Sequence, residues 1–352
     1  MNTTAATADR VMERFLLIAN GPALFNAIVT GLEMDIFARL SVPGGATFEE
    51  LVAHTKIPCH NLRILMLALC STELVVKQSD RYTNSSVAED LLASDAPDSW
   101  RHIMIGWQRI YYPAFAHMTS ALRSGTNHAA LAQHAGTEES LYQRLAHDPT
   151  LEEIFHRAMS AFTLRTMSSL TSNKEFSQVR HLLDVGGGSG TTARAIAEVH
   201  PQMRVTIFDL PSVANRAIEA IPAPLKERVL AQGGDLFEDD FPGNGDAILF
   251  SHVLEVFDPG RIIYLLSKAY KALPAGGKVF IYGFNSQADE QGGVSAARLS
   301  LYLNILASGQ GMAYPAADYE EWLRQAGFEE VETRQQLPYE HGLHIATKGR
   351  PA

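Results

Sequence analysis

Cysteine, positive charge and long apolar runs are all scarce in this sequence, and each shortage excludes a class of protein. Only Cys59 and Cys70 are cysteines among 352 residues, so we expect reduced thiols in a cytoplasmic protein and no disulfide framework. The net charge of −10 argues against a nucleic-acid ligand, because phosphate binding needs a clustered basic surface. No uninterrupted run of about 18 apolar residues occurs, and the opening residues lack the pattern of a secretory signal, so we expect neither a membrane span nor export.

Metal-ligand spacing is missing as well. The two cysteines do not form a CxxC pair, and Glu340, His341 and His344 in YEHGLH lack the i, i+4 helical spacing of a zinc-binding pair. We therefore expect no metal site.

Apolar residues at three- and four-residue spacing dominate the first half of the chain and predict helices. We expect the first helical stretch to be interrupted by a turn at Gly21 and Pro22. Residues 47–86 then predict a helix, a turn, a second helix and a short hairpin around Ser79 and Asp80, which is the outline of a winged helix.

The second helix of that outline, NLRILMLALCSTEL, contains one arginine and is mostly apolar, so it suits burial against protein better than insertion into a DNA groove. Apolar helices without a large domain of their own to cover suggest burial against a second copy of the chain. We predict a winged-helix-like dimerisation domain over residues 1–100 and a homodimer.

The second half alternates strands and helices. Strands are predicted over HLLDVGGG, RVTIFDL, DAILFSHVL and GKVFIYGF, separated by helical patterns such as TTARAIAEVH and RIIYLLSKAYKAL. This alternation predicts an α/β fold, with a Rossmann-like domain over 176–352 whose parallel sheet is covered by helices on both faces, and with further closing strands. Residues 101–175, which include an amphipathic helix over 155–170, are expected to form a helical linker that contributes to the substrate pocket.

The segment LLDVGGGSG, residues 182–190, is the strongest functional signal. A strand ends at Val185, and Gly186, Gly188 and Gly190 predict a turn that lets a ligand approach bare backbone before a helix begins. This glycine pattern alone does not decide the ligand, since dinucleotide-binding enzymes use a close relative of it.

Two later carboxylates favour S-adenosylmethionine. Asp209, in FDLP, ends the next strand, where a carboxylate can accept hydrogen bonds from both ribose hydroxyls. Asp235, in GGDLF, ends a third strand, where a carboxylate can accept a hydrogen bond from the adenine amino group. We expect further cofactor contacts from residues within or beside these motifs and the next strand, namely Asp184, Leu210, Gly234, Leu236 and Ser251.

Together LLDVGGGSG, FDLPSV, GGDLF, KALPAGGKV and the closing QAGF resemble the dimeric small-molecule O-methyltransferases of the caffeic-acid type, including their bacterial antibiotic-tailoring members. The resemblance covers nearly the whole chain. It implies a class I methyltransferase domain, a winged-helix dimerisation domain and a substrate pocket between them. It also implies that Ser160 or Thr163 lies near the methionine end of the cofactor, and that Met159 and Phe162 line the acceptor pocket.

The sequence departs from that family where the family carries its catalytic base, a histidine followed by an aspartate. In SHVLEVFDPGR, residues 251–261, Glu255 stands at the histidine position and Val256 at the aspartate position. The two glutamates that support the histidine in the family fall near Gly283 and Ala313. The whole unit of base and supporting carboxylates is therefore absent.

Three alternatives for the base follow from this departure. Glu255 could itself accept the proton, because a carboxylate in a closed, apolar pocket can be protonated near neutral pH. His252 could serve instead, although a strand-like segment would point it away from Glu255. Methyl transfer could also need no side-chain base, if the acceptor is already nucleophilic and is held in line with the sulfonium.

Other side chains are candidates for substrate contacts: Trp107, Arg298, Tyr302 and His341. We expect a methyltransferase acting on a small phenolic metabolite, with O-methylation as the family default. C-methylation of a phenolic ring is the main alternative, since LLIANGPALFNAIVTGLEMDIF resembles enzymes that methylate tyrosine-type rings in antibiotic pathways. A protein that binds the cofactor but promotes a cyclisation or hydroxylation is a third possibility.

Overall fold

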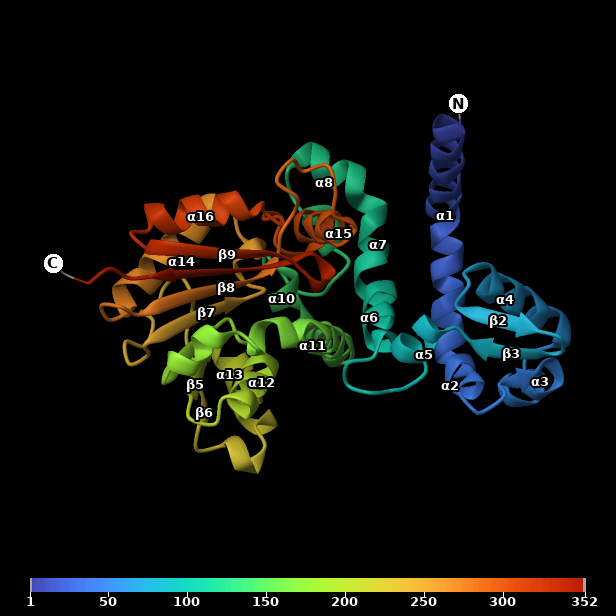
Figure 1. Cartoon of the computed structure of the whole chain (residues 1–352), viewed down its shortest axis with the longest axis horizontal. Coiled ribbons are helices and arrows are strands. Elements are labelled where there is room, and N and C mark those ends of the chain that lie inside the picture. The colour runs from blue at the N-terminus through green and yellow to red at the C-terminus, as the bar shows by residue number, and fades with distance from the viewer. Residues whose placement is uncertain (1, 351–352) are drawn as a thin grey trace. The chain divides into compact units, whose positions relative to one another are not determined.

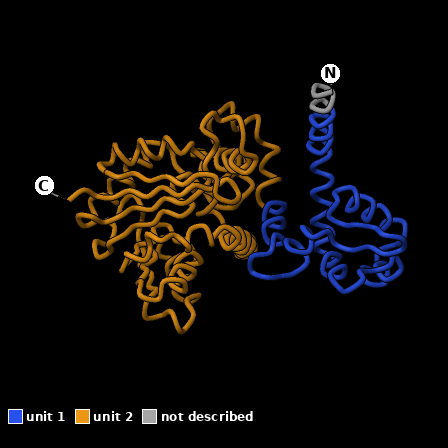
Figure 2. The backbone as a smooth tube through the Cα atoms, viewed as in Figure 1, with its two compact units in different colours: residues 1–109 blue, residues 110–352 orange. Residues whose placement is uncertain are grey.

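The computed structural model describes residues 2–350, with side chains described from Asp9 onward. The chain divides after Arg109 into two compact units (Figure 2). The predicted linker, residues 101–175, is shared between them, and its role at a substrate pocket stays a prediction.

Unit 1 is helical with one small sheet. Its helices and strands are α1 (Asn2–Glu33), α2 (Ile36–Leu40), β1 (Ala46–Thr47), α3 (Phe48–Thr55), α4 (Cys59–Ser71), β2 (Val75–Gln78), β3 (Arg81–Asn84), α5 (Ser86–Leu92) and α6 (Trp100–Gly106), and the π-helical turn η1 (Trp107–Tyr111) leads into unit 2. A capping box starts α3, because the Thr47 hydroxyl accepts the amide hydrogen of Glu50 while the Glu50 carboxylate accepts that of Thr47.

The predicted hairpin around Ser79 and Asp80 is confirmed. Strands β2 and β3 pair antiparallel from Val75 with Asn84 to Gln78 with Arg81, and β1 adds to the other edge of β3. The segment from α3 to β3 therefore follows the predicted order of helix, turn, helix and hairpin.

The turn expected at Gly21 and Pro22 is wrong, because α1 continues through both residues. A proline inside a helix removes one backbone hydrogen bond and crowds the preceding turn, at about 3 kcal/mol. Side chains bind carbonyls on both sides of this point: Asn20 donates to the Leu16 carbonyl and Asn26 to the Pro22 carbonyl, each at 2.8 Å. Neither bond reaches the carbonyl of Ile18, the oxygen four residues before Pro22 that loses its amide donor, so the helix continues through the proline without replacing that bond.

The amino-terminal part of α1 exposes an unusual amount of apolar surface. Six large side chains there are 52–77% exposed: Val11, Met12, Phe15, Leu16, Leu17 and Ile18. By length and composition alone the stretch Asp9–Glu33 could also cross a membrane. Further along, Val29 and Leu32 are fully buried in the core of unit 1, so only the first part of α1 lacks a covering layer.

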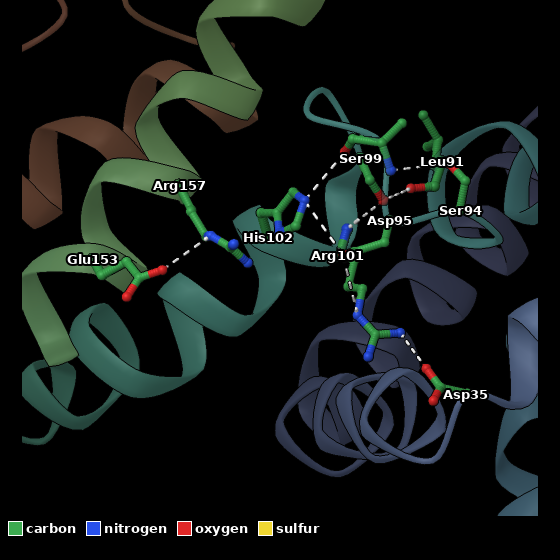
Figure 3. A network of polar contacts seen from close by, with 10 residues as sticks. Asp35, Leu91, Ser94, Asp95, Ser99, Arg101, His102, Glu153 and Arg157 are labelled. Carbon is green, nitrogen blue, oxygen red and sulfur yellow. Dashed lines mark hydrogen bonds and ion pairs between the residues drawn. The ribbon is translucent and has the colours of Figure 1, made fainter. Parts of the chain in front are cut away.

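A polar network joins α6 to the turn between α1 and α2 (Figure 3). Arg101 pairs with Asp35 at 2.8 Å and lies 3.8 Å from Asp95, which is also 3.6 Å from His102. Ser99 caps α6 by accepting the amide hydrogen of Arg101. The network lies at the surface, so we expect it to orient α6 and to add little stability.

Unit 2 contains a seven-stranded sheet in the order β6-β5-β4-β7-β8-β10-β9 (Figure 1). Its strands are β4 (His181–Val185), β5 (Arg204–Asp209), β6 (Val229–Gly233), β7 (Ala247–Ser251), β8 (Lys278–Phe284), β9 (Glu329–Leu337) and β10 (His341–Thr347). The first five strands are parallel, which confirms the predicted α/β class. Strand β10 runs antiparallel to both β8 and β9. A short turn joins β9 to β10, and such a turn can connect antiparallel strands only, because parallel strands need a longer crossover.

Helices precede, connect and cover these strands. They are α7 (Tyr112–Ala114), η2 (Phe115–His117), α8 (Met118–Ser124), α9 (His128–Leu131), α10 (Leu141–Arg144), η3 (Leu145–His147), α11 (Pro149–Thr171), η4 (Lys174–Gln178), α12 (Thr191–Val199), α13 (Pro211–Ala220), η5 (Ala223–Leu225), η6 (Leu254–Val256), α14 (Pro259–Ala272), α15 (Val294–Tyr302), η7 (Leu303–Ala307), α16 (Ala316–Gln325) and η8 (Pro338–Glu340).

The strands bury both faces, as predicted. In β7, Ile248 and Phe250 pack in one core with α14 and α16, while Ala247 and Leu249 pack in the other with α11, α12 and α13. This alternation follows from the two-residue period of a strand. Because the five strands are parallel, their carboxyl ends lie at one edge of the sheet, where the loops that follow them gather.

Candidate active site

The glycine loop after β4 has the conformation that its sequence predicts. Gly186 and Gly188 lie in the left-handed region, with φ of 71° and 57°. A β-carbon on Gly186 would lie 2.6 Å from the Val253 side chain, so this position has no room for another residue. Gly190 precedes α12, whose amino terminus therefore begins beside exposed backbone.

Asp209 faces this loop from the end of β5. Its Oδ2 accepts the amide hydrogen of Gly188 at 2.8 Å, and its Oδ1 accepts that of Leu210 at 2.7 Å. Burial raises the pKa of Asp209, while these two amide hydrogen bonds oppose the rise. The loop after β6 lies beside it, since Gly234 donates to the Asp209 carbonyl at 2.9 Å.

Asp235 follows Gly234 and caps the next turn. Its Oδ1 accepts the amide hydrogens of Phe237 and Glu238, at 2.8 and 3.2 Å. Leu236 is half-buried against one core of the sheet, and Leu210 is 37% exposed. The two loops therefore offer carboxylates and apolar side chains at the same sheet edge.

Asp184 is buried completely, one residue before the end of β4. Neither of its carboxylate oxygens has a hydrogen-bond partner within residues 2–350, and a β-carbon on Gly187 would lie 2.7 Å from its Oδ2. Burial, and then the charge of Asp209, raises the pKa of Asp184 to about 7. An acceptor-rich edge of this kind suits a ligand with hydroxyl groups, amino groups and positive charge, so these residues fit S-adenosylmethionine.

Helix α11 meets the glycine loop through hydroxyl groups. Ser160 Oγ and Thr191 Oγ1 are 3.2 Å apart, and Ser189 Oγ is equally far from Thr191 Oγ1. Thr163 lies almost one turn further along α11 and is half-buried. Ser251 ends β7, and its hydroxyl is buried without a partner in the described part of the chain.

The segment after β7 corrects one expectation. His252 was expected to point away from Glu255, but its Nδ1 lies 3.3 Å from Glu255 Oε1. The strand ends at Ser251, and His252 takes a left-handed conformation with φ of 57°, which is more accessible to histidine than to most residues. The 3-10 turn η6 then brings Glu255 back toward the imidazole.

A glycine makes the space for the Glu255 carboxylate. Glu255 is 3% exposed, and a β-carbon on Gly283 in β8 would lie 2.8 and 2.9 Å from its two carboxylate oxygens. Gly283 and Ala313 are the positions where we placed the supporting glutamates of the resembled family. This chain therefore has a small residue at each of those positions and a buried carboxylate at Glu255.

Aromatic side chains enclose His252. The Phe162 ring of α11 meets it edge-on at 6.4 Å and stacks on the ring of His341 at 5.8 Å, measured between ring centroids. His252 and His341 are themselves 5.0 Å apart, and Phe284 contacts both. Two predicted substrate residues, Phe162 and His341, are thus brought together with the predicted base.

A second aromatic group surrounds Arg298 of α15. The Tyr111 and Tyr302 rings stack at 3.9 Å, and the guanidinium lies 5.8 Å from the Tyr111 ring centroid. Burial lowers the pKa of Arg298, while nearby tyrosine hydroxyls oppose the change. Tyr111 also donates to the sulfur of Met159 at 3.8 Å, so Met159, Arg298 and Tyr302 form one cluster.

Tyr142 of α10 was not predicted as a site residue. Packing around its hydroxyl raises the pKa of Tyr142, and Tyr111 adds to this while a hydrogen bond with Tyr302 opposes it, so Tyr142 belongs to the tyrosine cluster although 36% of the residue is exposed. Its sequence neighbourhood, EESLYQRL, contains no feature that distinguishes it from an ordinary surface tyrosine. Trp107 belongs to unit 1, where it packs edge-on against Trp100, and its contact with substrate stays a prediction.

Comparisons with known proteins all indicate one methyltransferase family. Residues 115–329 match the model of the O-methyltransferase domain. The chain is 31% identical to an L-tyrosine C(3)-methyltransferase of Streptomyces lavendulae, over 96% of this chain and 93% of that protein. It is 29% identical to a 3-hydroxy-5-methyl-1-naphthoate 3-O-methyltransferase of Streptomyces sahachiroi, over 90% and 89% of the two chains.

Solved structures agree. The apo form of the S-adenosylmethionine-dependent methyltransferase SibL matches with a TM-score of 0.84 and 31% identity, over 96% of this chain and 99% of that one. Human N-acetylserotonin methyltransferase in complex with S-adenosylmethionine has the same fold, with a TM-score of 0.84 at 22% identity over 99% of this chain and 100% of that one.

Proposed function

Because the chain belongs to the O-methyltransferase domain family and uses S-adenosylmethionine as its cofactor, we propose that it methylates a ring carbon next to the hydroxyl of a tyrosine-like phenol. The name of the Streptomyces lavendulae relative, an L-tyrosine C(3)-methyltransferase, supports a tyrosine-type ring as the acceptor. The observation that carries the proposal is the buried Glu255 carboxylate beside His252, in a chain that lacks the histidine–aspartate unit of the related O-methyltransferases.

In this proposal His252 is the base and Glu255 is a positioning residue. The carboxylate lies behind Nδ1, so a proton on Nδ1 is held by Glu255 and the lone pair of Nε2 is left for the substrate. Glu255 is itself almost fully buried, and Phe162 and His341 enclose the imidazole in front of it. This arrangement favours Nε2 of His252 over the Glu255 carboxylate as the group that first accepts the phenol proton.

S-adenosylmethionine supplies an electrophilic methyl group on a sulfonium sulfur. His252 Nε2 accepts the phenol proton, which makes the neighbouring ring carbon nucleophilic, and Glu255 stabilises the imidazolium that forms. Bound beside Asp209 and the glycine loop, the cofactor would give its methyl group to the ring carbon and leave as S-adenosylhomocysteine, and the methylated carbon would lose its proton to restore the aromatic ring. Phe162 and Met159 are proposed to hold the ring in line with the methyl group.

The test is product analysis with L-tyrosine and related phenols as acceptors. We expect S-adenosylhomocysteine to form together with a product whose methyl group is on carbon by NMR. His252→Gln should lower kcat by about 10²–10³-fold while cofactor affinity stays within about twofold. The control is His200→Gln, since the His200 imidazole bonds to the Thr171 carbonyl and contacts the Phe176 ring, and neither of these residues belongs to the proposed site.

Other products would contradict the proposal in recognisable ways. A methyl group on oxygen would return the protein to the family default. Tight cofactor binding with an altered acceptor and no S-adenosylhomocysteine would indicate a cyclisation or hydroxylation. Full activity of the His252→Gln variant would leave proximity, or another residue, as the source of the rate.

For unit 1 we propose a cytoplasmic, winged-helix-like dimerisation domain, whose partner is a second copy of the chain. The support is the group of exposed apolar side chains on α1 between Val11 and Ile18, which a second copy of the chain would cover. Phe15→Glu and Ile18→Glu together should convert a dimer to a monomer in sedimentation analysis. A wild-type protein that is monomeric at micromolar concentration, or that binds lipid vesicles instead, would overturn this assignment.

A further inference from the structure

Strand β10 contains two equally buried histidines whose ring nitrogens differ in their partners. His341 and His344 are each 1% exposed. In His344 both nitrogens are bonded, Nδ1 with Thr333 Oγ1 at 3.2 Å and Nε2 with Asn285 Oδ1 at 3.1 Å. In His341, Nε2 has no hydrogen-bond partner within residues 2–350. A buried polar atom without a partner is unfavourable, so packing alone does not explain why a histidine stands here.

The turn before β10 fixes which nitrogen of His341 bears the hydrogen. Nδ1 lies 3.0 Å from the Pro338 carbonyl and 3.1 Å from the Tyr339 carbonyl, and carbonyls only accept. Nδ1 therefore donates, and Nε2 presents a lone pair. Burial lowers the pKa of His341 well below its usual range, and the neighbouring His252 adds to this, so the ring stays neutral.

The same turn is held in a sparsely populated conformation. Tyr339 and Glu340 both have positive φ, of 60° and 62°. The Glu340 carboxylate accepts the Ala296 amide hydrogen at 2.8 Å, and the Glu340 carbonyl accepts that of Asn285 at 2.9 Å. The backbone geometry that aligns two carbonyls with one imidazole is thus maintained by contacts from α15 and from the end of β8.

His252 presents a second acceptor beside it. With Glu255 at Nδ1, Nε2 of the neutral ring also has a lone pair, and this atom too is buried without a partner in the described residues. The two rings lie 5.0 Å apart and nearly perpendicular, and each contacts both Phe162 and Phe284, whose own rings stack at 5.4 Å. Two buried acceptor nitrogens therefore belong to neighbouring imidazoles in one aromatic cluster.

We infer that these two nitrogens together bind an acceptor ring that has two adjacent hydrogen-bond donors, namely a phenol with an ortho hydroxyl or amino group. The inference rests on the proposed function and narrows its substrate class. A phenol with a single donor satisfies one nitrogen and leaves the other buried and unpaired, which disfavours it. His252 takes the proton in this arrangement, and His341 is a positioning residue that accepts a hydrogen bond from the second group.

The experiment compares acceptors that differ in one substituent: L-tyrosine and its 3-hydroxy, 3-amino and 3-methoxy derivatives. We expect the wild-type enzyme to prefer the hydroxy and amino compounds over L-tyrosine and the methoxy compound by about tenfold or more in kcat/KM. His341→Asn retains a donor for the turn carbonyls but removes the acceptor at the ε position, so the preference should fall to about one, mainly through KM.

Two variants control for structure. His341→Gln has an acceptor that can reach the ε position and should keep most of the preference. His344→Asn disturbs an equally buried histidine on the same strand and should lower thermal stability with no change in the preference.

The Kd values of the four compounds are also measured on enzyme loaded with S-adenosylhomocysteine, and the ratios of these values give the same preference from binding alone. This arm separates the two proposals, because it reports donor preference even if no carbon methylation occurs. A wild-type preference for L-tyrosine, or an unchanged preference in His341→Asn, would overturn the inference.

Discussion

The two ends of the site in unit 2 are built in different ways. The proposed cofactor end comes from three strand–loop units in succession, with Gly186 and Gly188 after β4, Asp209 at the end of β5 and Asp235 after β6. The acceptor end combines His252 and Glu255 with residues far along the chain, such as Gly283 and His341. A local motif can keep one cofactor in place while remote substitutions change the chemistry done with it.

The strongest way to break this comparison is to remove the buried charge at the acceptor end alone. Glu255→Gln keeps the shape of the side chain but cannot stabilise a protonated His252, so we expect kcat to fall by about 10²–10³-fold. Cofactor affinity, measured by calorimetry, should stay within about twofold. Glu153→Gln, which removes an exposed carboxylate 3.4 Å from Arg157 on α11, is the matched control.

The complementary change affects the cofactor end. In the wild type, the backbone amides of Gly188 and Leu210 donate to the Asp209 carboxylate at 2.8 and 2.7 Å. Asp209→Asn places a side-chain amide beside these two donors. We expect S-adenosylmethionine to bind about 30- to 100-fold more weakly, because one charged acceptor is lost and the glycine loop is displaced. The acceptor preference should not change when the cofactor is saturating. A change in that preference would mean that the two ends are not separable.

A smaller effect is expected from a substitution at Gly283, which stands where the resembled family has one of its two supporting glutamates. Gly283→Ala introduces a β-carbon 2.8 Å from Glu255 Oε1, so the carboxylate has to move away from His252. We expect kcat to fall by about tenfold with KM for the cofactor unchanged. Gly243→Ala is the control, since nothing lies within 4 Å of a β-carbon there. Equal activity of the two variants would argue against a role for the Glu255 position.

Sequence could predict the loops of the proposed cofactor end because each belongs to a short local motif. Hydrophobic periodicity identifies the strand that ends at Asp209, GGDLF marks the loop of Asp235, and the two loops meet at one edge by the rules of a parallel sheet. The acceptor end could not be predicted in the same way. One left-handed residue, His252, reverses the direction in which its side chain was expected to point, and no sequence pattern indicates that conformation.

The other misses have similar physical causes. A proline normally ends or kinks a helix, but α1 continues through Pro22 with the loss of one backbone hydrogen bond, that to the Ile18 carbonyl. The hydrogen bond between Tyr142 and Tyr302 depends on tertiary packing between segments more than one hundred residues apart. Such contacts are properties of the assembled fold, so a single sequence does not contain a local signal for them.

The smallest predicted effect concerns a proton at the cofactor end. Asp184 has a pKa of about 7 in the folded protein against 3.8 for an ordinary aspartate, so between these pH values the folded state binds more protons than the unfolded state. Stability of the ligand-free protein should therefore fall as pH rises through this window. Asp184→Asn removes this decline, and we expect its Tm to exceed that of the wild type by roughly 5 °C more at pH 7 than at pH 5.

His344 has the opposite effect on the pH dependence of stability, which makes the comparison of Tm values between the two proteins more specific. Burial lowers its pKa to about 4 from 6.5, so the folded state binds fewer protons than the unfolded state between these values, and this histidine makes stability rise with pH. In the Asp184→Asn variant the histidine contribution remains, and the Tm should change little or increase from pH 5 to pH 7. A parallel decline in both proteins would show that Asp184 is ionised throughout, and its unpartnered oxygens would then have to be stabilised by a charge or donor outside the described residues.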